Sequence, residues 1–151
     1  MAAEAAIANG ATVAIFDAMP SVARKLLMAG KSGLNISHSE DEAHFRSRYL
    51  SPDERLGAYL ERFGPADVRQ WMDSLGIESF VGSSGRVFPV AMKASPLLRS
   101  WLARLRSDGA EMYTRHRWMG WADDEALVFQ TPDGVRRVEF TYSAYDNQIV
   151  P

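Results

Sequence analysis

Apolar residues recur at helical spacing in three segments in the middle of the chain. Residues 51–63 combine a serine–proline start with an apolar residue at every third or fourth position, which predicts an amphipathic helix. Residues 65–75 repeat this pattern between a proline and a glycine, so we interpret the region of about 51–76 as a helical hairpin. A third amphipathic helix is predicted to begin near Ser95 and Pro96.

Weaker helical signals precede these segments. Residues 2–9 are almost all alanine, which favours a helix, and Gly10 stands where a C-terminal cap belongs. Residues 21–29 are compatible with one or two further helical turns. The segment 29–40 is rich in glycine and small polar residues, which is typical of a loop.

Short apolar runs bounded by turn residues predict the strands. Residues 12–16 form such a run, which ends on Asp17. Two short strands are predicted on either side of a turn at Gly82–Gly85. Three more predicted strands, which we interpret as a three-stranded meander, lie near residues 110–118, 126–130 and 135–140. Together the helices and strands predict an α/β protein.

Composition narrows the class of protein. A chain of 151 residues with 46% hydrophobic residues is large enough for one soluble domain with a core. The formal net charge of -2 gives no field that attracts polyanions, so we expect no nucleic-acid partner. There is no cysteine, which excludes disulfides and thiolate metal sites. We find no basic leader and no apolar run long enough to cross a bilayer, and we expect a cytoplasmic protein without a membrane partner.

Asp17 is the first candidate for chemistry. In dinucleotide-binding folds, an acid at the end of the second strand binds a ribose, and a glycine-rich loop precedes it by about 20 residues. Counting back from Asp17 puts that loop before residue 1, and the chain contains no Gly-x-Gly-x-x-Gly. Strands that end in aspartate are common, so this signal alone leaves a structural turn as the alternative.

Two further motifs carry a resemblance to a known family. The first is an Arg-Lys pair at 24–25 followed by the glycine-containing segment 30–35, and the second runs from Arg86 to Ser95 and contains "RVFP" and "MKAS". In this order and spacing, over about residues 1–140, they resemble the bacterial NAD(P)/FAD-dependent oxidoreductases of the BaiN and YhiN type, which include aminoacetone oxidase family FAD-binding enzymes.

The resemblance implies a partial glutathione-reductase-like, Rossmann-like FAD-binding domain over residues 1–140, with a helical insertion at about 51–76 and a three-stranded β-meander. A divergent tail, 141–151, would follow, and we expect it to be disordered. NAD(P)H would be the electron donor in the full-length family. The implied cofactor-binding residues are Asp17, Arg24, Lys25, Gly30, Lys31, Gly33, Leu34, Asn35 and Trp118.

Each of these residues has an implied role. Asp17 would accept hydrogen bonds from the adenosine ribose, and Arg24 and Lys25 would lie near the phosphates of FAD. The main chain of residues 30–35 would approach the cofactor closely, a role that suits glycine. Trp118 would contribute main-chain contacts to the adenine.

The chain also departs from the family pattern. Ala23 stands where the family has glycine, Ser32 interrupts the glycine run, and Leu34 replaces a cysteine that many members have. Because the glycine-rich loop that would hold the pyrophosphate is missing, we expect a fragment of an FAD-dependent, NAD(P)-linked oxidoreductase that carries the ribose-binding half of the site and binds FAD weakly or not at all. The alternative is a non-catalytic remnant or interaction domain, able to self-associate through an exposed sheet edge. A truncated or frame-shifted reading frame would explain both the missing glycine-rich loop and the divergent tail at 141–151.

Other candidate residues have simpler interpretations. His44 and His116 lack a third ligand at metal spacing, so we expect no metal site. A loop histidine such as His38 is more often a solvated polar residue than an acid or base near a flavin, so we expect no catalytic role for it. We expect the tryptophans Trp101, Trp118 and Trp121 to pack in the core or on the meander rather than to form a stacking platform for a ligand. No residue is assigned a catalytic role.

Overall fold

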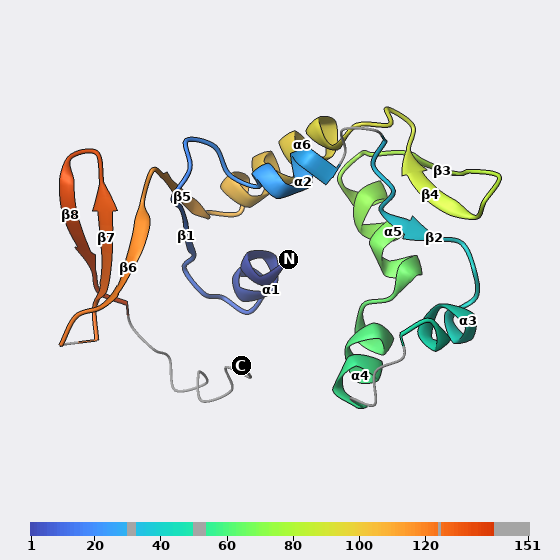
Figure 1. The fold of residues 1–151 in the computed structure, drawn as a ribbon, viewed down its shortest axis with the longest axis horizontal. Helices are drawn as coiled ribbons and strands as arrows, with labels where there is room; N and C mark the ends of the chain where they lie inside the picture. The colour runs from blue at the N-terminus through green and yellow to red at the C-terminus, as the bar shows by residue number, and fades with distance from the viewer. Residues whose placement is uncertain (30–32, 50–53, 124, 141–151) are drawn as a thin grey trace. The chain divides into compact units, whose positions relative to one another are not determined.

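The computed structural model describes residues 1–29, 33–49, 54–123 and 125–140 (Figure 1). The chain divides into two compact units. The first unit contains Met1–Val22 and the described residues from Gly109 onward, and the second unit contains Ala23–Asp108. Among the described residues, no helix has the length and apolar character that a bilayer span requires.

The first unit begins with helix α1, Ala2–Ala8. The helix ends where Gly10 adopts a φ of +83°, a left-handed conformation that favours glycine. The Gly10 N–H donates to the Ile7 carbonyl at 2.8 Å, and the Ala11 N–H donates to the Ala6 carbonyl at 3.0 Å. These two bonds form a Schellman motif, so the predicted cap at Gly10 is confirmed.

A parallel strand pair follows in the first unit. Strand β1, Ala14–Asp17, pairs with β5, Glu111–Thr114, and Asp17 lies opposite Thr114. The predicted strand at 12–16 is therefore confirmed with slightly different bounds. Because the strands are parallel, Asp17 and Thr114 both stand at the carboxyl edge of this pair.

The meander of the first unit consists of β6 (Arg117–Trp121), β7 (Leu127–Thr131) and β8 (Gly134–Val138), which pair antiparallel in this order (Figure 1). The meander is confirmed, but the single strand predicted at 110–118 is wrong. That segment breaks into β5 and β6 at Arg115, whose φ of +58° is incompatible with an extended strand.

An aromatic cluster joins the parallel pair of the first unit to its meander. Phe16 from β1 stacks on Phe129 from β7 with a centroid distance of 4.2 Å, and on Tyr113 from β5 at 5.0 Å. The His116 ring lies within 5.7 Å of both Phe16 and Tyr113. This aromatic cluster, Phe16, Tyr113, His116 and Phe129, is the core of the carboxyl edge.

The second unit is organised around a core of Leu34, Met72, Ala94 and Leu97. These residues come from the loop before β2 (Ser37–His38), from α5 (Pro65–Ser74) and from α6 (Ala94–Ser107). Helix α2, Arg24–Ala29, lies along α6 and adds Leu26 to this core. The helix predicted from Ser95 onward is confirmed as α6. Its Arg104 is half-buried and donates to the Ser74 hydroxyl at 2.8 Å.

A small antiparallel sheet completes the second unit. Its order is β2-β4-β3, with β3 at Ser79–Val81 and β4 at Arg86–Pro89. The two strands predicted around the Gly82–Gly85 turn are confirmed. The prediction of an uninterrupted loop over 29–40 is wrong at β2, because main-chain bonds on either side of this two-residue strand tie it to β4.

Helices α3, α4 and α5 lie between β2 and β3 in the chain. Helix α3, Glu42–Ser47, was not predicted; its cap is Asp41, whose carboxylate accepts from the His44 N–H at 3.0 Å. The two helices of the hairpin predicted at about 51–76 are confirmed as α4, Glu54–Arg62, and α5, but in the described part of the chain they do not pack side by side, so the predicted hairpin is wrong. Figure 1 shows α5 leading away from the end of α4. The predicted cap residues at 51–53 lie outside the described residues, as does the tail from 141 on.

Candidate functional site

Asp17 ends strand β1 with an oriented carboxylate. Its Oδ1 accepts a hydrogen bond from the Met19 N–H at 2.8 Å, which makes an Asx turn. The side chain is half-buried. Among the described residues, no hydrogen bond or ion pair involves the second oxygen, Oδ2. The carboxylate is thus fixed through one oxygen while the other is available to a hydroxyl donor.

The turn after β5 holds the Asp17 segment from the neighbouring strand. The Arg115 N–H donates to the Met19 carbonyl at 3.0 Å, and the His116 N–H donates to the Asp17 carbonyl at 2.9 Å. Arg115 adopts its left-handed conformation in making these bonds. Strain of this kind persists only where the surroundings hold it, and it concentrates at functional sites.

His116 is a central residue of this edge that the sequence did not identify. Its Nδ1 lies 2.8 Å from the Thr114 carbonyl, and its Nε2 lies 3.2 Å from Arg136 Nη1. A carbonyl oxygen only accepts and a guanidinium only donates, so both bonds require the neutral ring with its proton on Nδ1. The guanidinium of Arg136 lies over the Tyr113 ring, with Cζ 4.4 Å from the centroid. Sequence spacing gave no signal of this arrangement, because the four residues come from β5, from the turn after it and from β8, with Arg136 20 residues after His116.

Trp118 lies on β6, where it pairs with Phe129 of the aromatic cluster. Its side chain is 55% exposed, and it meets the 57% exposed Trp121 edge to face with a centroid distance of 6.1 Å. These two tryptophans therefore pack against each other on the meander, as expected, while much of each side chain stays exposed. Trp101 of the second unit is half-buried, edge to face against Trp71 at 5.1 Å, and matches that expectation.

The second unit carries the remaining predicted site residues. Arg24 and Lys25 are exposed at the start of α2, directly after Ala23, whose φ is +57°. A left-handed conformation favours glycine, which explains why a glycine is expected at position 23. The exposed cations give this end of α2 a local positive charge.

The segment after α2 has mixed roles. Gly33 has a φ of +116°, and a Cβ there would lie 3.0 Å from Met92 Cε. The Leu34 side chain is only 3% exposed and belongs to the core, and its N–H donates to the Met92 carbonyl at 3.2 Å. Asn35 is exposed. The predicted residues Gly30 and Lys31 lie outside the described residues.

The predicted site residues therefore fall into two groups. Asp17 and Trp118 belong to the first unit, where the aromatic cluster connects their strands. The described residues of the second group are Arg24, Lys25, Gly33, Leu34 and Asn35, which belong to the second unit.

Comparison with known protein families decides what kind of domain this is. Residues 1–142 match the family model described as the HI0933-like protein Rossmann domain. The chain belongs to the HI0933-like family. This confirms the resemblance drawn from the sequence motifs and the Rossmann-type α/β fold class. A comparison with curated proteins found no match.

His38 has a structural role in this HI0933-like domain. Its Nε2 lies 3.0 Å from the Ser84 carbonyl, and its Nδ1 accepts from the Glu40 N–H at 3.2 Å. The expectation of a solvated loop histidine is therefore wrong. Arg48 donates to both carboxylate oxygens of Glu40, at 2.7 and 2.8 Å, and this hydrogen bonding lowers the pKa of Glu40 from its ordinary value.

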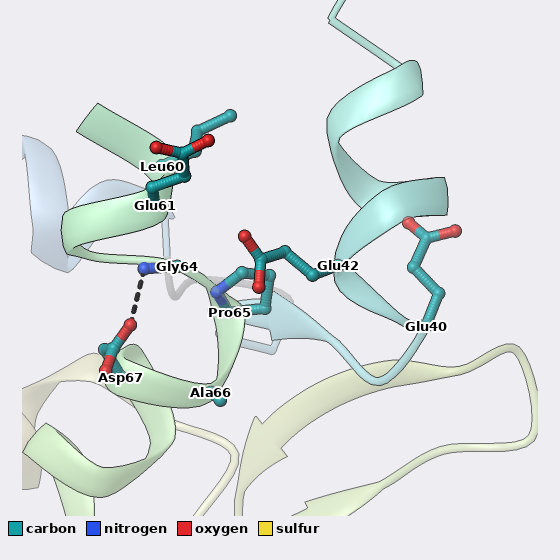
Figure 2. Close-up of a pocket in the computed structure, with 8 residues that line it drawn as sticks. All are labelled: Glu40, Glu42, Leu60, Glu61, Gly64, Pro65, Ala66 and Asp67. Carbon is teal, nitrogen blue, oxygen red and sulfur yellow. Dashed lines mark hydrogen bonds between the residues drawn. The ribbon is translucent and has the colours of Figure 1, made fainter. Parts of the chain in front are cut away.

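A shallow pocket of the HI0933-like domain lies between α3, α4 and the start of α5 (Figure 2). Its volume of about 100 Å³ is far below what a nucleotide needs. Arg46 neutralises part of its acidic lining by pairing with Glu61 at 2.8 Å, and Asp67 accepts from the Gly64 N–H at 2.7 Å. Among the described residues, no group of His, Asp and Glu side chains has an arrangement that could hold a metal ion. The pocket therefore gives no support to a ligand site.

Proposed function

We propose that this chain binds the adenosine end of FAD and serves an FAD-dependent, NAD(P)-linked oxidoreductase. The observation that carries the proposal is the Asp17 carboxylate, which stands at the carboxyl end of a parallel strand with one oxygen anchored at 2.8 Å and the other available. In α/β folds, ligands bind at the carboxyl ends of the parallel strands. A fixed carboxylate at that edge is suited to accept hydrogen bonds from the two ribose hydroxyls.

The other predicted residues have proposed roles that follow from their chemistry. Trp118 offers main-chain groups and an exposed ring on β6, the strand that follows the turn bonded to Asp17. Arg24 and Lys25 are exposed cations suited to the cofactor phosphates. The main chain of Gly33–Asn35 would approach the cofactor, whereas the Leu34 side chain stays in the core. When bound, the flavin ring would supply the redox chemistry.

The pyrophosphate of FAD needs further donors. Rossmann domains hold it with the main-chain N–H groups of a glycine-rich loop and the positive end of a helix. These 151 residues contain no Gly-x-Gly-x-x-Gly. We therefore propose that a polypeptide of this sequence binds FAD weakly, with the adenosine half contributing most of the affinity.

The test is a titration of the purified chain with ADP and with FAD, followed by NMR of the Met19 amide. Asp17→Asn keeps the shape of the side chain but removes its charge. We expect this variant to raise the Kd for ADP about tenfold or more, because hydrogen bonds to charged groups are the strong ones. The exposed Asp133→Asn, in the same unit, is the matched control and is expected to change nothing. Equal affinity of the wild type and Asp17→Asn, or no binding of ADP, would refute the proposal.

A second candidate function is a non-catalytic interaction domain without bound cofactor. The observation that favours it is the apolar surface of β6, where Met119 is 61% exposed beside Trp118 and Trp121. Light scattering after size exclusion distinguishes the two proposals. Self-association together with no ADP binding supports the interaction domain, and a monomer that binds ADP supports the nucleotide site.

A further inference from the structure

The turn Thr114–His116 holds Asp17 in place, and the turn itself adopts a backbone conformation that costs free energy. Arg115 is a non-glycine residue with a φ of +58°, and left-handed backbone is unfavourable for side chains with a Cβ. In this conformation the main-chain N–H groups of Arg115 and His116 reach the carbonyls of Met19 and Asp17. If the turn relaxed, both bonds would lengthen and the Asx turn of Asp17 would lose its support.

The His116 side chain closes this turn from the other side. Its Nδ1–H donates to the Thr114 carbonyl at 2.8 Å, so a single residue contacts both strand ends: its N–H bonds Asp17 and its ring bonds Thr114. The ring is held in the aromatic cluster, and Arg136 donates to its Nε2 at 3.2 Å. The ring position is thus fixed on three sides.

We propose that neutral His116 is a positioning residue for the Asp17 carboxylate, and that a second proton, by setting a cationic ring against the Arg136 guanidinium, displaces the ring from the turn and so releases this carboxylate from its ribose-binding orientation. The inference rests on the proposed function of Asp17 and names a group that regulates the same site. His116 acts through Thr114 and the main chain of Asp17, and it does not itself contact the ligand.

The expected pH dependence follows from the groups around the ring. Histidine side chains change charge between about pH 5 and pH 8. The second proton would go to Nε2, which removes its acceptor lone pair and sets a cation 3.2 Å from the Arg136 guanidinium. Phe16 and Phe129, from β1 and β7, present uncharged rings to His116. The titratable or charged residues that contact His116 or adjoin it in the chain include Asp17 on β1, Tyr113 on β5, Arg136 on β8, and the neighbouring Arg115 and Arg117.

The first experiment reads the His116 tautomer in the free, full chain. Nitrogen-15 NMR of the imidazole distinguishes a proton on Nδ1 from one on Nε2, and we expect Nδ1–H at pH 7.5. A ring with its proton on Nε2 overturns the proposal. The Met19 amide reports the bond to Asp17 Oδ1, and its shift should titrate together with the His116 ring. Independent titration of these two signals also overturns it.

The second experiment uses variants with adenosine as the probe, because adenosine carries no group that titrates between pH 5 and pH 8. His116→Phe keeps a ring in the aromatic cluster but removes both nitrogens, and we expect about a tenfold rise in the Kd at pH 7.5, or about 1.4 kcal/mol. His116→Asn keeps a donor at the position of Nδ1 and should retain more affinity than His116→Phe. The exposed His44→Asn, in the other unit, is the control and should behave as wild type.

A rescue separates positioning from a general loss of stability. Glycine adopts the left-handed turn at position 115 without strain, so adding Arg115→Gly to His116→Phe should recover most of the adenosine affinity and remove the dependence on pH. Wild-type affinity should fall about tenfold between pH 7.5 and pH 5.5. Failure of the rescue, or a flat wild-type profile, overturns the proposal. If the His116 ring and the Met19 amide titrate together but adenosine does not bind, the proposed function fails while the positioning of Asp17 by His116 stands.

Discussion

Leu34 provides a quantitative test of how the second unit is held together. The sequence motif assigned this residue to the cofactor, whereas the structure buries its side chain to 3% exposure against Met72, Ala94 and Leu97. Leu34→Ala would leave a cavity, because the Leu34 N–H bond to the Met92 carbonyl at 3.2 Å fixes the main chain and hinders collapse. Core Leu→Ala changes cost about 2–5 kcal/mol, and we expect about 3 kcal/mol here.

Urea unfolding followed by tryptophan fluorescence measures this cost, since Trp71 packs against the same core. For a chain of this size, 3 kcal/mol corresponds to a fall in Tm of about 6–12 °C. Asn35→Ala is the matched control, because the adjacent side chain is exposed and its removal should change stability by less than about 0.5 kcal/mol. Equal stabilities of the two variants would refute the assignment of Leu34 to the core.

Three further predictions concern local features of the second unit. Gly85→Ala should destabilise the unit by about 2 kcal/mol in urea unfolding, because φ is +78° and the new Cβ would lie 2.6 Å from His38 Cε1; an unchanged midpoint would contradict this. Ala23→Gly should raise stability by up to about 1 kcal/mol, since relief of the left-handed strain outweighs the added entropy of the unfolded chain, and a lower Tm would be the contrary result. The Arg48 hydrogen bonds lower the pKa of Glu40 in the folded state, so the stabilisation that they give is present above pH 4.5 and is lost as the pH falls through the folded pKa. Below pH 4.5, the Tm of Arg48→Gln should therefore fall less steeply with pH than the Tm of the wild type. Equal slopes would contradict this assignment.

Local sequence signals were sufficient to predict those helix ends and strands that depend on contacts between residues close in the chain. The cap at Gly10 and the end of α5 before Gly76 follow from glycine in the left-handed conformation, which neighbouring main-chain bonds complete. The strands on either side of the Gly82–Gly85 turn were predictable for the same reason.

Features that depend on distant partners were not predictable. Arg115 shows no local signal for a left-handed turn; the bonds to Asp17 and Met19, almost a hundred residues earlier in the sequence, hold it there. The strand β2 likewise exists because β4 pairs with it.

The candidate site divides in the same way. Asp17 could be proposed as a ribose-binding acid because it ends a short apolar strand, and the family motifs supplied the other candidate residues. The role of His116 depends on its contacts with β5 and β8, and the burial of Leu34 depends on α5 and α6. Neither tertiary arrangement leaves a pattern in the sequence itself.

The most direct test of the account is whether Asp17 recognises ribose hydroxyls. Binding of adenosine, 2′-deoxyadenosine and 3′-deoxyadenosine to wild type and Asp17→Asn should be compared by NMR titration at pH 7.5. We predict that wild type prefers adenosine over each deoxy analogue by about tenfold, as expected for loss of one hydrogen bond to a charged group, and that Asp17→Asn loses most of this preference. Equal affinity of wild type for all three nucleosides would contradict the account.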